Sequence, residues 1–324
     1  MVNIPNTFGM RVRARVWAEF HSIEELRALL EQYRGEKMMA VGAGSNLLFT
    51  QDYDGVLFHS GMRDVRVVSE TDTTIDIEAE AGLVMDDLVA MTVEKGLWGL
   101  ENLSYIPGEV GASAIQNVGA YGVEAKDAIV AVKTLCVSDG SEHIFSNDEC
   151  QYAYRDSIFK NQLKGQYIIT SVVYRLSKTF HPILDYGHLR AVTGDTPTPQ
   201  QVREAVTAIR KQKLPEVSEL GSAGSFFKNP VVPQSQFEAL YQQYPTMPHF
   251  IVEGGVKIPA AWLIEQCGWK GKTFGGARVY DKQPLVIVNT GNASSQEVMT
   301  LAQLICDSVK AKFNITINPE VNYI

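Results

Sequence analysis

The segment Y-I-P-G-E-V-G-A-S-A-I-Q-N-V-G-A-Y-G-V-E at 105–124 restricts the possible folds of this chain more than any other. It holds four glycines and three alanines, and its only charged residues are Glu109 and Glu124. The side chains of this segment are too small and too apolar for an ordinary surface loop. Because small side chains leave the backbone uncovered, this segment can approach another group very closely.

Two structures account for a backbone surface of this kind. One is a binding surface for a large flat ligand, and a flavin ring system with its pyrophosphate would suit it. The other is a tightly packed crossing of a helix and a strand inside the core. The residues of 105–124 favour these two structures about equally.

A second glycine-rich segment, V-G-A-G-S-N-L-L-F at 41–49, follows a predicted buried strand over 37–42. Its glycines allow consecutive backbone N–H groups to point into one concavity, and such nests bind phosphate oxygens. The segment is not a G-x-G-x-x-G dinucleotide fingerprint, because Leu47 stands where the third glycine belongs. A plain connection between a strand and a turn explains it as well.

The segment G-S-A-G-S-F-F-K-N-P at 221–230 places Ser225 between small residues and two phenylalanines. Its hydroxyl could be a nucleophile, a proton donor or only part of a turn. A hydrolase serine usually lies in G-x-S-x-G, whereas Phe226 and Phe227 follow here. None of the six histidines has an informative setting, so the donor and turn roles are favoured over the nucleophile.

The composition argues against several classes of partner. The chain has 324 residues, enough for two or three domains, and a formal net charge of −8. This charge argues against binding nucleic acid or anionic membranes through the whole surface. No secretory signal, membrane-spanning stretch, C-x-x-C or zinc spacing is evident. We therefore expect a cytoplasmic protein with buried free thiols at Cys136, Cys150, Cys267 and Cys306.

Apolar periodicity predicts a mixture of helices and strands. Capping boxes at 22–25 and 294–297 begin two helices, and a third is predicted over 198–211. Strands are predicted over 37–42, 73–80, 166–176 and 314–318. The clean alternation of 73–80 predicts a half-exposed strand. Because strands and helices do not alternate strictly, the sequence predicts an α+β fold rather than a doubly wound sheet.

Taken together and in order, these segments resemble one family, the UDP-N-acetylenolpyruvoylglucosamine reductases (MurB), which are cytoplasmic flavoenzymes of peptidoglycan synthesis. The resemblance covers nearly the whole chain. It is carried by N-T-F-G (6–9), V-G-A-G-S-N-L-L-F (41–49), G-L-E-N-L-S-Y-I-P-G (99–108), I-Q-N-V-G-A-Y-G-V-E (115–124), Y-R-D-S-I-F-K (154–160), G-S-F-F-K-N-P (224–230), A-A-W-L-I-E-Q-C-G-W-K-G (260–271) and P-E-V (319–321). In addition, H-P-I-L-D-Y-G-H-L (181–189) resembles the loop with a substrate-covering tyrosine, Tyr186, that marks the type I form.

The resemblance implies a two-part FAD-binding domain of the vanillyl-alcohol-oxidase or PCMH type and a smaller α/β substrate-binding domain. The first FAD-binding subdomain would span 1–66. The second would span 67–205 and also include 318–324. The substrate-binding domain would span 206–317. A monomer is expected.

The resemblance also implies the reaction. Hydride from NADPH passes through FAD to C3 of the enolpyruvyl ether of UDP-N-acetylglucosamine, and a proton must then reach C2, where charge has spread into the carboxylate. Ser225 matches the family's proton donor. Arg155 matches an arginine whose guanidinium suits that carboxylate. Glu320 matches the third catalytic position, where a carboxyl beside a growing anion must be protonated or strongly paired.

Binding residues are implied as well. FAD, held without a covalent bond, would contact Gly42, Ala43, Gly44, Ser45, Asn46, Leu47, Pro107, Gly108, Gly111, Ala112, Ser113, Ile115, Asn117, Gly119, Ala120, Tyr121 and Gly122. The UDP-sugar, and NADPH in turn, would contact Tyr186, Lys213, Asn229, Lys257 and Gln283. No metal is expected.

The chain departs from the family pattern around P-E-V, where the family often has an acidic residue before and an arginine after. Here these positions are Asn318 and Asn322, so the surroundings of Glu320 differ. Three alternatives leave motifs unexplained: a flavoprotein oxidase or dehydrogenase with another substrate, a nucleotide-binding scaffold without activity, and a serine hydrolase.

Overall fold

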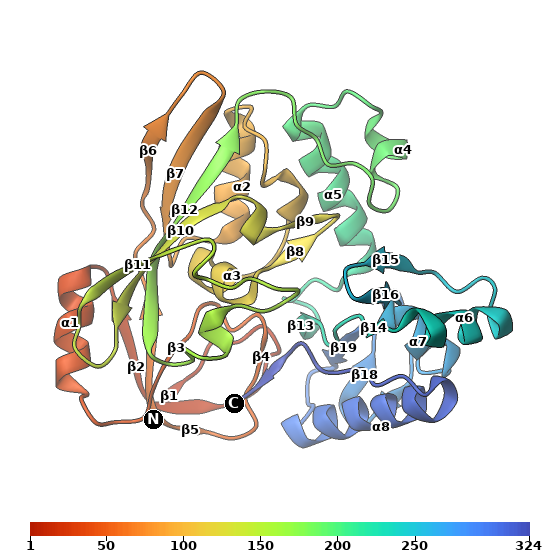
Figure 1. Ribbon diagram of the computed structural model, residues 1–324. Coiled ribbons are helices and arrows are strands. Elements are labelled where there is room, and N and C mark those ends of the chain that lie inside the picture. The colour runs from red at the N-terminus through yellow and green to blue at the C-terminus, as the bar shows by residue number, and fades with distance from the viewer. The chain divides into compact units, whose positions relative to one another are not determined.

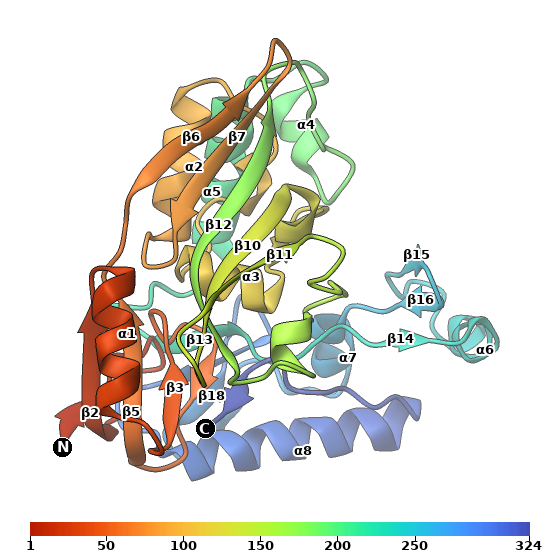
Figure 2. The same ribbon diagram turned by 60° about the vertical axis from the view of Figure 1, so that its left-hand side comes forward.

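The computed structural model describes all of residues 1–324, and the chain divides into two compact units. The first unit comprises Met1–Ile4, Arg13–Ala43 and Tyr53–Arg210. The second comprises Pro5–Val12, Gly44–Asp52 and Lys211–Ile324. Figures 1 and 2 trace the elements of each unit from two sides.

The smaller sheet of the first unit has the strand order β1-β2-β5-β3. Its strands are β1 Val2–Asn3, β2 Arg13–Phe20, β3 Met38–Ala40 and β5 Tyr53–Ser60. Strands β2, β5 and β3 run parallel, and α1 (Ile23–Gln32) connects β2 to β3. The helix buries Leu26 and Leu30 in a cluster with Phe20 and Phe58, so the sheet and the helix share one core.

The larger sheet of the first unit is antiparallel, with the order β11-β10-β12-β7-β6. Its strands are β6 Val65–Glu70, β7 Thr74–Glu80, β10 Ile129–Cys136, β11 Glu142–Ser146 and β12 Tyr167–Ser177. The short helix α3 (Val110–Gln116) lies against β12 and β7, as Figure 1 shows. This unit also contains α2 Met85–Glu94, α4 Leu189–Thr193, the hairpin β8 Gly119–Ala120 with β9 Val123–Glu124, and the 3-10 helices Glu101–Leu103, Ala125–Asp127 and Ile158–Lys160. Helix α5 (Pro199–Lys213) ends at the passage from the first unit to the second.

The second unit contains three small sheets and three helices. The sheets have the orders β13-β19-β18-β17, β14-β16-β15 and β20-β4. Their strands are β4 Leu47–Leu48, β13 Gly221–Ser225, β14 Val231–Val232, β15 Phe250–Val252, β16 Gly255–Lys257, β17 Thr273–Phe274, β18 Ala277–Val279, β19 Val286–Asn289 and β20 Asn322–Tyr323. The helices are α6 Gln234–Gln243, α7 Ala260–Gln266 and α8 Ser295–Phe313. In β20 and β4 the last residues of the chain run parallel to 47–48.

The mixed content confirms the α+β prediction, and α8 confirms its predicted capping box. Ser294 Oγ accepts from the Glu297 amide at 3.2 Å, and the Glu297 carboxylate accepts from the Ser294 amide at 2.8 Å. The box predicted at the start of α1 is only half formed. Ser22 accepts from the Glu25 amide, but the Glu25 carboxylate accepts from His21 instead.

Two strand predictions need correction. Strand β7 is buried on both faces rather than half exposed, because its outward carboxylates are neutralised: Asp76 pairs with Arg175 at 2.8 Å, and Glu78 accepts from Lys133 at 2.8 Å. The segment 314–318 forms no strand. Its alternation buries Ile315 and Ile317 at 2% exposure each, but the backbone joins no ladder there.

The cap of α8 yields a stability prediction. We expect Ser294→Ala to lower the free energy of unfolding by about 1 kcal/mol, because the Glu297 amide then loses its acceptor. Chemical denaturation followed by circular dichroism measures the change. Ser308→Ala is the matched control in the same helix: its hydroxyl only donates back to the Leu304 carbonyl, so its loss leaves stability unchanged or slightly higher. Equal losses in both variants would contradict the capping account.

Candidate functional site

The two glycine-rich segments meet inside the first unit. A Cβ placed on Gly42 would lie 3.0 Å from Glu109 Oε2 and 3.4 Å from the Ala112 Cβ. Gly42, Ala43 and Ala112 are each partly exposed. The result is a surface of backbone and methyl groups, drawn from two segments far apart in the sequence, that a large side chain at Gly42 would fill.

The opposite face of the same helix is a close-packed crossing. A Cβ on Gly111 would lie 2.9 Å from the Ala81 Cβ, and Val110 and Ala114 are fully buried. Ser113 lies below the surface, with its hydroxyl 3.3 Å from that of Tyr174. Of the two structures that the sequence left open, the close-packed crossing therefore occurs, and the binding surface for a flat ligand stays a prediction for the other face of α3.

Arg155 is held against the end of the second glycine-rich segment. Its guanidinium donates to the Gly119 carbonyl, and Nη1 lies 3.5 Å from the Asn117 carbonyl and 3.9 Å from Glu124 Oε1. A Cβ on Gly119 would lie 2.8 Å from Nη1, so only glycine leaves room for the guanidinium. The Arg155 backbone has φ of +56°, a left-handed conformation that is uncommon outside glycine and costs free energy.

The loop of Tyr186 is tied to the second glycine-rich segment. The Asn102 side-chain amide donates to the Tyr121 carbonyl at 2.7 Å and to the Ile183 carbonyl at 2.8 Å. The rings of Tyr121 and Tyr186 meet edge to face, with centroids 6.2 Å apart. Asn102 is fully buried, so one residue sets the spacing of the two segments. Residues 105–124 alone carry no sign of this contact, and Asn102 was not among the predicted site residues.

The second half of the first glycine-rich loop belongs to the second unit. Gly44 has φ of +66°, and a Cβ on it would lie 2.9 Å from the Pro5 carbonyl, so this position needs glycine. Asn46 Nδ2 donates to the Glu320 carbonyl at 3.4 Å. Leu47 pairs with Asn322 in the parallel ladder of β4 and β20. Residues 44–47 thereby lie against the C-terminal segment that carries Glu320.

Backbone pairing within the second unit brings Ser225 and Glu320 together. The Glu320 amide donates to the Phe226 carbonyl at 2.8 Å, and the Lys228 amide donates to the Asn318 carbonyl at 2.9 Å. Phe227 and Pro319 form a β-bridge between these contacts. Ser225 and Glu320 are each partly exposed beside this pairing. Residues almost one hundred positions apart are therefore neighbours, as a shared site requires, while Arg155 belongs to the first unit.

The predicted substrate-binding residues of the second unit lie on separate elements. Asn229 Oδ1 accepts from the Ala260 amide at 2.9 Å, which fixes the start of α7. Lys257 ends β16 and pairs with Val231. Gln283 closes the turn before β19, where its carbonyl accepts from the Val286 amide at 3.0 Å. Lys213 is the last residue of α5.

Carboxylates of the first unit differ in how they are paired. Asp86 accepts two hydrogen bonds from Arg203, at 2.6 and 3.0 Å. Although burial opposes it, this pairing lowers the Asp86 pKa. Glu109, at 7% exposure, has no such partner, and its Oε1 lies 3.9 Å from His59 Nε2. Burial raises the Glu109 pKa to about 7, with Arg63 lowering it and Glu19 raising it.

Arg210 is a partly buried charge of the first unit. Its Nε donates to the Tyr105 carbonyl at 2.9 Å, and burial lowers its pKa. Like Asn102 and Glu109, it was not among the predicted site residues. Each of these residues depends on contacts between segments distant in the sequence, which periodicity and motif spacing do not report.

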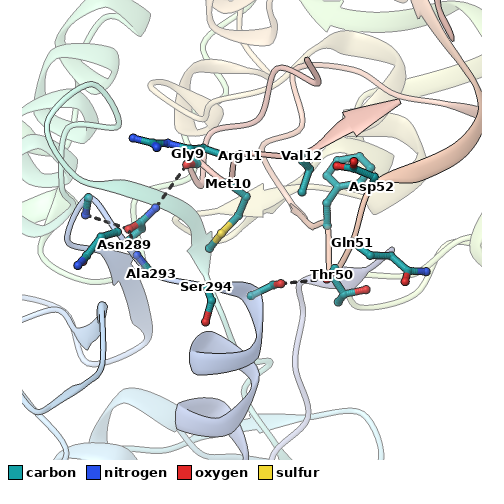
Figure 3. A pocket seen from close by; sticks show the side chains of 14 residues that line it. Gly9, Met10, Arg11, Val12, Thr50, Gln51, Asp52, Asn289, Ala293 and Ser294 are labelled. Carbon is teal, nitrogen blue, oxygen red and sulfur yellow. Dashed lines mark hydrogen bonds between the residues drawn. The ribbon is translucent and has the colours of Figure 1, made fainter. Parts of the chain in front are cut away.

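A surface pocket of about 490 Å³ lies in the second unit between 9–12, 49–52 and the start of α8 (Figure 3). It contains none of the predicted site residues. Asn289 closes one side, accepting from the Gly291 and Ala293 amides at 2.9 Å each. No group of three or more His, Cys, Asp or Glu side chains lies close enough to hold a metal ion.

Comparisons with known proteins identify the chain as an FAD-binding protein and specify it further. Residues 14–146 match a family model described as an FAD binding domain. Residues 215–324 match the UDP-N-acetylenolpyruvoylglucosamine reductase C-terminal domain. No helix has both the length and the apolar character needed to cross a membrane.

Whole-chain relatives agree with the family models. A UDP-N-acetylenolpyruvoylglucosamine reductase of Bacteroides fragilis is 50% identical over 98% of this chain and 97% of its own length. A reductase of the same name from Flavobacterium johnsoniae is 43% identical over 98% and 96%. The crystal structure of MurB from Thermus caldophilus, at 23% identity, covers 98% of this chain and 95% of its own, with a TM-score of 0.68, and so shares the fold. The chain belongs to the UDP-N-acetylenolpyruvoylglucosamine reductase family.

Glu109 yields a prediction on the pH dependence of stability. Because its pKa in the folded state is raised to about 7, the folded chain holds this proton more tightly than the unfolded chain. The wild type should therefore lose stability as the pH rises from about 4.5 towards 7, and Glu109→Gln should not. At pH 8 we expect the variant to be more stable by about 2 kcal/mol, with little difference at pH 4.5. Denaturant unfolding of the flavin-free proteins at the two pH values measures this, and parallel pH profiles would refute it.

Proposed function

We propose that this chain reduces UDP-N-acetyl-3-O-(1-carboxyvinyl)-glucosamine to UDP-N-acetylmuramate at the expense of NADPH, in the synthesis of peptidoglycan precursors. Membership of the reductase family supports the reaction. The structural observation that carries the proposal is the backbone pairing of 226–228 with 318–320, which makes Ser225 and Glu320 neighbours. A nucleotide-binding scaffold would have no need of this pair.

The glycine-rich loops fit FAD because they expose backbone and methyl groups at Gly42, Ala43 and Ala112, where a larger side chain would fill the space. When bound, FAD supplies hydride transfer from NADPH to C3 of the enolpyruvyl group. Residues assigned to hold it are Gly42, Ala43, Gly44, Ser45, Asn46, Leu47, Pro107, Gly108, Gly111, Ala112, Ser113, Ile115, Asn117, Gly119, Ala120, Tyr121 and Gly122. The buried positions Gly111 and Ser113 act through the packing of α3 rather than through an exposed side chain.

Ser225 acts as the general acid of the second half of the reaction. Its hydroxyl donates a proton to C2, and the C–H bond formed there replaces the enediolate. A free serine hydroxyl is a weak acid, so it acts only on a strongly basic carbon and where charge stabilises the alkoxide left behind. Lys228 lies three residues further along the same segment and carries a suitable charge. It or bound water returns the proton to Ser225.

Arg155 binds the substrate carboxylate, whose negative charge grows as the enediolate forms. Two carbonyl contacts and the missing side chain of Gly119 orient the guanidinium before substrate arrives, so little reorganisation is needed. Glu320 completes the set beside Ser225. Asn318 and Asn322 flank P-E-V in place of the charged residues that the family often has there, so the surroundings of Glu320 differ from the family pattern.

The UDP-sugar, and NADPH in turn, contact Tyr186, Lys213, Asn229, Lys257 and Gln283. The lysines suit the diphosphate as point charges. The corresponding domain assignment is 1–66 and 67–205 with 318–324 for FAD, and 206–317 for substrate. The protein acts as a cytoplasmic monomer that binds no nucleic acid.

Anaerobic stopped-flow measurements on Ser225→Ala test the proposal. NADPH should bleach the flavin absorbance at the wild-type rate, because Ser225 has no role in that step. Return of the absorbance on adding the enolpyruvyl substrate should be slower by about 100-fold or more. Ser222→Ala, three residues earlier in β13, is the matched control and should behave as the wild type. If the enolpyruvyl substrate failed to reoxidise the wild-type flavin, the assigned reaction would be contradicted. If reoxidation were normal in Ser225→Ala, only the role of Ser225 would be contradicted.

A further inference from the structure

An unpaired carboxyl group lies directly beneath the first glycine-rich loop. Glu109 Oε2 is 3.0 Å from the place where a Cβ of Gly42 would stand, and Glu109 is more than nine-tenths buried. No hydrogen bond to its carboxyl forms within the protein, and His59 Nε2 lies 3.9 Å from Oε1. Buried carboxylates are normally paired, and those of Asp76 and Glu78 in the same unit are.

His59 is fixed with one nitrogen turned towards this carboxyl. Its Nδ1 lies 3.0 Å from the Val41 carbonyl, and because a carbonyl only accepts, Nδ1 carries a hydrogen. The ring packs on Trp17, with centroids 5.1 Å apart, which keeps the imidazole in place. Nε2 then faces Glu109 Oε1 at 3.9 Å, beyond hydrogen-bond distance, so no hydrogen bond pairs the carboxyl. Glu109 is neutral when protonated and carries one negative charge when ionised.

The other charges around Glu109 do not remove this negative charge. Arg63 and Glu19 act on the carboxyl with opposite signs and neither is hydrogen-bonded to it. Glu19 itself lies 3.3 Å from His21. An ionised Glu109 therefore leaves a negative charge beside backbone that, in the proposed function, receives the diphosphate of FAD. A fixed negative charge beneath an anionic ligand opposes its binding, and burial strengthens this effect.

We propose that FAD binding is linked to protonation of Glu109, so that the chain binds FAD with this carboxyl protonated and holds it more weakly once the proton is lost. The inference rests on the proposed function in one respect, the assignment of FAD to the 42–47 loop. Glu109 is a positioning residue here, because it acts on the cofactor through charge and takes no part in the reaction. The raised pKa of Glu109 places the change near neutral pH.

Titration of the flavin-free protein with FAD, followed by quenching of flavin fluorescence from pH 6.5 to 8.5, tests the link. We expect the wild-type Kd to rise by about 10-fold across this range, as loss of one linked proton requires. Calorimetry at pH 8.5 in two buffers of different ionisation enthalpy should show uptake of a fraction of a proton, up to one, for each FAD bound. The calorimetric result comes from the wild type alone and does not depend on how a variant folds.

Two variants locate the proton. In Glu109→Gln the Kd should change by less than about 2-fold over the same range, with no proton uptake at pH 8.5. Glu24→Gln removes the same charge from an exposed position of α1 and should keep the wild-type profile. A wild-type Kd independent of pH, or an unchanged pH profile in Glu109→Gln, would overturn the inference while leaving the proposed function intact. Absence of FAD binding at every pH would contradict the proposed function itself.

Discussion

The structure of the first unit depends on the close approach of small residues around α3. Gly111 packs on Ala81 with no room for a side chain, and Gly42 reaches Ala112 across the other face. Backbone and methyl groups make both contacts. One face of α3 can therefore be buried against Ala81 while the face with Ala112 stays partly exposed. The tight turn that follows leads to Gly119, whose missing side chain makes room for the Arg155 guanidinium. One packing constraint thus leaves Gly42 partly exposed and makes room for Arg155, the two positions that the proposed function assigns to FAD and to the substrate carboxylate.

The buried carboxylates of the first unit differ in whether a cationic side chain pairs with them. In β7, Asp76 and Glu78 are neutralised by Arg175 and Lys133 and serve to hold the sheet together. Glu109 is as deeply buried and has no comparable partner. A fold under selection for stability alone would pair this carboxyl or replace it. Its position beside Gly42, in the loop that the proposed function assigns to FAD, agrees with the role in FAD binding proposed above.

Local signals predicted those parts of the structure that local physics decides. Helix α8 could be predicted because its cap and its apolar stripe of Val298, Leu301 and Ile305 agree. Alternation alone could not show whether 314–318 forms a strand, because Ile315 and Ile317 can be buried without backbone pairing to another strand. The contacts of Asn102 and the position of His59 beside Glu109 involve distant segments, so only the folded chain reveals them. The motifs did indicate which segments approach other parts of the chain closely, because their glycines are needed locally for it.

Flavin content of purified Gly42→Val tests the central claim most directly, namely that the bare surface shared by Gly42 and Ala112 receives FAD. The added side chain would occupy that surface, whereas Ala40→Val adds the same kind of bulk at an exposed position of β3 and serves as the control. The account predicts a folded, colourless Gly42→Val protein beside a wild type and an Ala40→Val protein that carry stoichiometric FAD. A yellow Gly42→Val protein with the full complement of FAD would contradict it.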